Sequence, residues 1–102
     1  MVSGRARGSG ADSAADLRRA YSQVKSAESS RDLARDDLDF TRDELNEALA
    51  NYGEGRLSLA AVESLRATEN EKFLAYYVSQ QTAERARLNV LRLAGTLLAA
   101  LK

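Results

Sequence analysis

The chain has 102 residues, with 15 lysines and arginines, 15 aspartates and glutamates, and no formal net charge at pH 7. Histidine, cysteine, tryptophan and proline are absent, which excludes disulfide bonds, thiolate metal sites and the most common general base of enzymes. The balanced charge argues against a nucleic-acid binder, because such a protein needs a basic surface to neutralise phosphates. No apolar run approaches the roughly 18 residues that span a bilayer.

Residues 1–12 begin the chain with glycine, serine and arginine and carry no periodic apolar pattern. Such a composition is typical of flexible linkers, including those added for expression. No signal peptide is recognisable, because residues 1–10 lack an apolar segment. We expect this segment to be a flexible leader without a function of its own.

A long helix is predicted from about residue 13 to residue 52, with Asp12 or Ser13 as its N-cap. Apolar or small residues recur along it at steps of three, four and seven: Ala20, Val24, Ala27, Ala34, Leu38, Leu45, Ala48 and Tyr52. A second apolar track runs beside the first: Leu17, Tyr21, Val24, Leu38, Leu45 and Leu49. The two stripes indicate that this helix packs against partners on two sides. The middle of the seam is weak, because Glu28 and Arg31 lie on it.

A reversal of the chain is predicted at residues 53–57, where Gly53 and Gly55 lie close together. Glycine is the residue that most readily takes positive φ, and no comparable helix breaker follows until Gly95. We therefore expect one tight turn, centred on Gly55, between two long helices.

The second helix is predicted from about residue 58 to residue 101, with Ser58 as its N-cap. Its apolar stripe consists of Val62, Leu65, Phe73, Tyr76, Ala83, Val90, Ala94, Leu97 and Leu101. No strand-like alternation is sustained, so the fold class is all-α, a long antiparallel two-helix hairpin. A hairpin of two helices buries one apolar stripe of each helix and leaves the second stripes exposed to water. We therefore expect the hairpin to assemble into a dimer, a four-helix bundle or a larger helical barrel.

Acidic residues are concentrated before the turn, with seven acids and three arginines between Arg31 and Glu47. The plainer interpretation is a solvated helix face with some ion pairs along the helix. The alternative is an acidic turn end that meets a cationic partner or lines a pore. Asp36 and Asp37 are adjacent and therefore lie on different faces of a helix, so we expect no paired-carboxylate catalysis. The chain is predicted not to be an enzyme and to bind no metal or other cofactor.

Three short segments resemble the TolC-type outer membrane efflux proteins. Tyr52-x-x-Gly55 followed by the residues 56–62, Arg-Leu-Ser-Leu-Ala-Ala-Val, is similar to the periplasmic tip of that family's helical hairpins. Upstream, residues 20–24 are similar to the family's Ala-Tyr-x-x-Val, and downstream residues 93–97 resemble its Leu-Gly-Thr-Leu ending. The three segments keep the family's order and spacing, and the resemblance covers residues 17–101.

The resemblance implies that the chain is one hairpin of a protein that has two such hairpins and a β-barrel in the outer membrane. Three protomers of the family form an exit duct for drugs, metals or proteins, and this segment would lie in the periplasm. The turn would contact the periplasmic adaptor protein of a tripartite pump, through Tyr52, Gly53, Glu54, Gly55, Arg56, Leu57 and Ser58. Partners are therefore other copies and the adaptor, with no nucleic acid and no membrane span in this chain.

One position departs from the family pattern. Family members often carry an acid six or nine residues after the tip glycine, facing the lumen, but Ala61 and Ser64 occupy those positions here. Glu63 lies between them and points about 100° to 200° away on a helix. We therefore do not carry the family's selectivity ring over to this hairpin.

Two other classes remain open from the sequence. A secreted helical hairpin of the WXG100 type has a similar length and a turn in mid-chain, but its Trp-x-Gly turn is missing here. A coiled-coil hairpin like that of a pump adaptor has the same physical pattern, although its arginine, leucine and serine are spread over several turns, whereas residues 56–58 are contiguous. Either alternative makes the chain a stand-alone helical-hairpin interaction protein.

Overall fold

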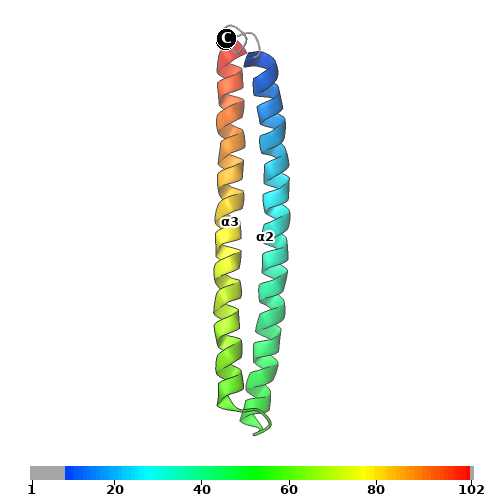
Figure 1. The fold of residues 1–102 in the computed structure, drawn as a ribbon, viewed down its shortest axis with the longest axis vertical. Helices are drawn as coiled ribbons and strands as arrows, with labels where there is room; N and C mark the ends of the chain where they lie inside the picture. The colour runs from blue at the N-terminus through cyan, green and yellow to red at the C-terminus, as the bar shows by residue number, and fades with distance from the viewer. Residues whose placement is uncertain (1–8, 102) are drawn as a thin grey trace. The chain divides into compact units, whose positions relative to one another are not determined.

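The computed structural model describes residues 9–101, which form two long α-helices and no strand. Helix α2 extends over Ser9–Gly53 and helix α3 over Leu59–Leu101. The chain is an all-α helical hairpin, as the sequence predicts, and its reversal lies between Gly53 and Leu59 (Figure 1). Helix α2 is continuous through Arg31, so the weak middle of its seam does not break it.

The start of α2 differs from the sequence prediction. The helix begins at Ser9, so the expected N-caps Asp12 and Ser13 lie inside it, and the expected leader 1–12 overlaps it by four residues. The physical reason is that extending an existing helix by a residue costs little, whereas starting a new one is costly. The remaining leader residues, 1–8, lie outside the described residues.

The chain divides into two compact units, each with a stretch of both helices. We call Ser29–Gln80 the turn unit, because it contains the reversal. We call the described residues of Met1–Glu28 and Gln81–Lys102 the terminal unit.

The turn unit has the larger buried core. Its buried apolar side chains are Leu38, Leu45, Ala48 and Val62. Thr41 is also buried, with 3% of its surface exposed, and its hydroxyl donates a hydrogen bond of 2.9 Å to the carbonyl oxygen of Asp37. Because that hydroxyl has a partner, its burial carries no penalty for an unsatisfied polar group. Two ion pairs join the helices, Arg42–Glu69 at 3.2 Å and Lys72–Asp37 at 2.8 Å.

The terminal unit is held by smaller side chains. Its buried residues are two alanines, Ala20 and Ala83, and Val24, Val90 and other apolar residues beside them are half-buried. One ion pair joins its helices, between Arg87 and Glu28 at 3.5 Å. The apolar side chains that are fully buried are thus fewer and smaller here than in the turn unit.

A row of small residues at seven-residue intervals follows the packed side of α2. The row consists of Ala20, Ala27, Ala34, Thr41 and Ala48, all buried or half-buried. A repeat of seven is the spacing that keeps one seam of a helix against its neighbour. Small side chains in such a row allow close approach of the facing helix. The sequence identified the four alanines of this row but not Thr41.

Many large apolar side chains remain exposed on both helices. In the turn unit, Leu33 and Phe40 of α2 are 70% and 63% exposed, and Phe73, Leu74 and Tyr77 of α3 are also exposed. In the terminal unit, Tyr21, Leu88, Leu91 and Leu98 are exposed. Of the second apolar track predicted from the sequence, Leu38 and Leu45 are buried in the seam, whereas Tyr21 is exposed. No helix among residues 9–101 is both long and apolar enough to cross a membrane.

Candidate functional site

The hairpin turn begins with a helix C-cap built around Gly55. The amide of Arg56 donates a hydrogen bond of 2.8 Å to the carbonyl oxygen of Asn51, and the amide of Gly55 donates one of 3.0 Å to that of Tyr52. These two bonds are the Schellman pattern, which satisfies carbonyl groups at the end of a helix. The pattern requires a left-handed residue, and Gly55 supplies it with φ of 76°. The predicted role of Gly55 in the reversal is confirmed.

The turn ends with the N-cap of α3. The hydroxyl oxygen of Ser58 accepts a hydrogen bond of 3.3 Å from the amide of Ala61, and its carbonyl oxygen accepts one of 3.3 Å from the amide of Val62. This is the geometry of a serine N-cap, in which the side chain satisfies one of the free amides of the first helical turn. The prediction of Ser58 as N-cap is therefore correct.

All seven residues predicted as the partner-contact site lie at this turn. Tyr52 and Gly53 end α2, and residues 54–58 form the connection to α3. Tyr52 is 44% exposed, Leu57 is half-buried, and the other five residues are exposed. The structure thus gathers the predicted residues on an accessible surface whose backbone is fixed at both ends by caps.

The charges of the turn itself neutralise each other. Arg56 and Glu54 form an ion pair of 3.0 Å, with side chains 72% and 55% exposed. Such an exposed pair contributes little to stability, because water screens it. A partner with its own charges would compete for either side chain at little cost.

The ion pair between Lys72 and Asp37 in the turn unit shifts a pKa. The pKa of the Lys72 ammonium is raised above its ordinary value of 10.5, chiefly because it donates a hydrogen bond to the carboxylate of Asp37 and also because that carboxylate carries the opposite charge. The adjacent Asp36 forms no ion pair within residues 13–101. Asp36 and Asp37 therefore have different surroundings, as expected for neighbours on a helix.

Among the described residues, no group of three or more acids could hold a metal ion. This observation concerns the part of the chain that the structure describes, and the prediction of no cofactor stays a prediction.

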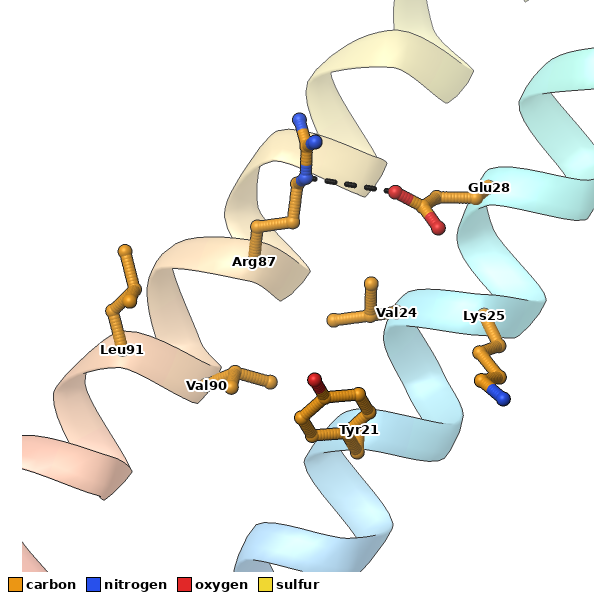
Figure 2. Close-up of a pocket in the computed structure, with 7 residues that line it drawn as sticks. All are labelled: Tyr21, Val24, Lys25, Glu28, Arg87, Val90 and Leu91. Atoms are coloured by element: carbon orange, nitrogen blue, oxygen red, sulfur yellow. Dashed lines mark ion pairs between the residues drawn. The ribbon is translucent and has the colours of Figure 1, made fainter.

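A second site, which the sequence did not single out, lies in the terminal unit. A hollow of about 370 Å³ is lined by Tyr21, Val24, Lys25, Glu28, Arg87, Val90 and Leu91. Figure 2 shows Tyr21 and Val24 of α2 facing Val90 of α3, with the Arg87–Glu28 ion pair beside them. A further hollow of about 430 Å³ adjoins it at Tyr21 and Lys25 and is also lined by Leu17, Arg18 and Ser22.

The sequence contained a signal for this second site. Tyr21 and Leu17 belong to the predicted second apolar track, and Arg18 and Lys25 lie within one turn of them. What the sequence could not show is that α3 completes the hollow from the other side with Val90 and Leu91, because that requires the register between the helices.

Comparisons with protein-family models, with curated proteins and with solved structures gave no match for this chain.

Proposed function

We propose that this chain is a periplasmic helical hairpin of an outer membrane efflux channel of the TolC type. In this role it forms part of the wall of the exit duct, and its turn contacts the adaptor protein of a tripartite export pump. The channel would be a trimer, as in the family that the sequence resembles.

The turn carries this proposal. The resemblance of residues 52–62 to the family's tip rests on an aromatic residue, a glycine three positions later and a serine that opens the returning helix. In the structure, Gly55 has the positive φ and Ser58 makes the N-cap. The residues that carry the resemblance are therefore the ones on which the reversal depends, as expected for a motif that specifies a hairpin tip.

The exposed apolar side chains of both helices support the same proposal. Large apolar side chains such as Leu33, Phe40, Leu88 and Leu91 are exposed in the single hairpin. Exposed apolar surface of this kind is typical of an interaction site that other helices cover in an assembly. Neighbouring hairpins in the wall of a helical duct would provide such helices on both sides.

The proposal is tested in the full-length protein in its own host, by fractionation and by cross-linking from the turn. The chain has no cysteine, so Arg56→Cys places one thiol of this hairpin at the turn, and Glu84→Cys places one at an exposed position of α3 in the terminal unit. We expect a trimer in the outer membrane fraction. We also expect the Arg56→Cys variant, but not the Glu84→Cys variant, to cross-link to a periplasmic adaptor.

A protein found outside the envelope fractions would contradict the proposal, and so would a correctly folded Arg56→Cys variant that cross-links to no adaptor. A secreted or cytosolic dimer would instead favour the second candidate function, a stand-alone helical-hairpin interaction protein. The observation that keeps this candidate open is the same exposed apolar surface, because a second copy also covers it.

A further inference from the structure

The terminal unit carries an apolar hollow with unpaired cations, which we call the cationic hollow. Its apolar walls include Leu17, Tyr21 and Leu91, and Arg18 and Lys25 line it. Within the described residues, neither Arg18 nor Lys25 forms an ion pair. The hollow therefore offers an apolar surface and two free positive charges to a ligand.

The turn unit carries a surface of the opposite charge on α2, which we call the acidic strip. Leu33 and Phe40 are seven residues apart and hence on one face of the helix, and both are mostly exposed. The acids within one turn of them on that face are Asp36, Asp37, Asp43 and Glu44. Only Asp37 of these four forms an ion pair among residues 13–101.

The two surfaces match in chemistry. Each presents large apolar side chains surrounded by charge, positive in the hollow and negative on the strip. The same contrast holds for the sequences of the two units: Met1–Glu28 with Gln81–Lys102 contain nine basic and four acidic residues, whereas Ser29–Gln80 contains six basic and eleven acidic residues. The formal charges are thus +5 and −5, although the whole chain is neutral.

We propose that the acidic strip of one copy docks in the cationic hollow of a second copy of this chain. Phe40 and Leu33 lie against Tyr21 and Leu91, and the free carboxylates approach Arg18 and Lys25. Contacts between two hollows or two strips would bring like charges together, which is unfavourable. The interface therefore joins different surfaces of the two copies, and it does not depend on the function proposed above.

The test is sedimentation equilibrium of the chain and of three variants, each with aspartate at an exposed apolar position. Wild type associates at micromolar concentration. Phe40→Asp damages the strip, Leu91→Asp damages the hollow, and each weakens self-association by about tenfold or more. Leu74→Asp alters a residue of α3 that is 60% exposed and lies outside both surfaces, and it leaves association unchanged.

Mixing the two defective variants gives the sharper result. The Phe40→Asp chain retains an intact hollow and the Leu91→Asp chain retains an intact strip. An equal mixture therefore forms a dimer through one contact at concentrations where each variant alone is mostly monomeric. Raising the salt concentration weakens this dimer, because screening reduces the attraction between the charges. Circular dichroism checks that all variants remain helical.

Four outcomes would overturn the proposal. They are a monomeric wild type, undiminished association of either Phe40→Asp or Leu91→Asp, an equal loss in Leu74→Asp, and an equal mixture that stays monomeric.

Discussion

Gly55 is the only residue among 9–101 with positive φ. An added Cβ at Gly55 would meet no atom within 4 Å, and the same is true of Gly53. Both positions therefore have room for a Cβ atom, and the two glycines differ in their backbone conformation. Gly53 is the last residue of α2, with φ that other residues adopt, whereas Gly55 holds the left-handed position that caps the helix.

We expect Gly55→Val to lower the free energy of unfolding by about 1–2 kcal/mol, because a β-branched residue is strained in the left-handed region. Gly53→Ala is the matched control. It should range from neutral to a gain of about 1 kcal/mol, because alanine loses less conformational freedom than glycine on folding. Urea denaturation followed by circular dichroism measures both. Equal, negligible shifts would show that neither glycine is conformationally required.

At the scale of the element, Ala48 belongs to the row of small residues on the packed side of α2. Ala48 is 5% exposed, and two positions along the helix Ala50 is exposed. The same residue type therefore occupies the packed side and the solvent side of one helical turn.

Ala48→Leu should destabilise the chain by about 1–3 kcal/mol, because a larger side chain in a packed seam forces the helices apart or strains its own rotamer. Ala50→Leu should change the free energy of unfolding by less than about 0.5 kcal/mol. Thermal unfolding compares the two. A similar effect of both substitutions would mean that the seam at Ala48 is loosely packed.

Because of the ion pair between Lys72 of α3 and Asp37 of α2, we expect the free energy of unfolding to fall at high pH. The pKa of Lys72 is raised in the folded chain, so its contribution is complete below the unfolded pKa and is lost as the pH rises through the folded value. Between about pH 9 and pH 12, wild type should lose more stability than Lys72→Met. Wild type and Lys72→Met differ only at position 72, so the difference between their losses reports the contribution of Lys72. Parallel losses would show that the pair contributes nothing.

The sequence predicted the elements well because its helix breakers are few and act locally. Two glycines and a serine locate the turn, and the recurring apolar and small residues locate the packed side of α2. It failed where the outcome depends on α3 facing α2. Thr41 was missed because threonine is polar and is not expected in an apolar row. Its hydroxyl can be buried because it donates a hydrogen bond to the carbonyl oxygen of Asp37. The hollow at Tyr21 and the exposure of Phe40 likewise follow from the register between helices.

At the scale of the whole molecule, the two units differ in the size of their cores. The buried residues of the turn unit include two leucines and a valine, whereas those of the terminal unit are alanines. Buried apolar area stabilises a fold in proportion to its size, so the two units should differ in local stability.

Hydrogen exchange followed by mass spectrometry should therefore show faster exchange of helical amides in the terminal unit than in the turn unit. The comparison belongs at low protein concentration, because the proposed association would protect the cationic hollow of the terminal unit and the acidic strip of the turn unit. Uniform protection of both units under these conditions would indicate that the helices open only together.

The caps at both ends of the turn also bear on the order of folding. A helix pair closes a loop whose entropy cost grows with its length, and the ion pairs between the helices are 27 residues apart for Arg42–Glu69 and 35 for Asp37–Lys72. The pair Glu28–Arg87 closes a far longer loop. We therefore expect contacts between the two helices to form first next to Gly55 and last in the terminal unit. A valine at position 55 would then slow folding, and a defect at Val90 would mainly speed unfolding.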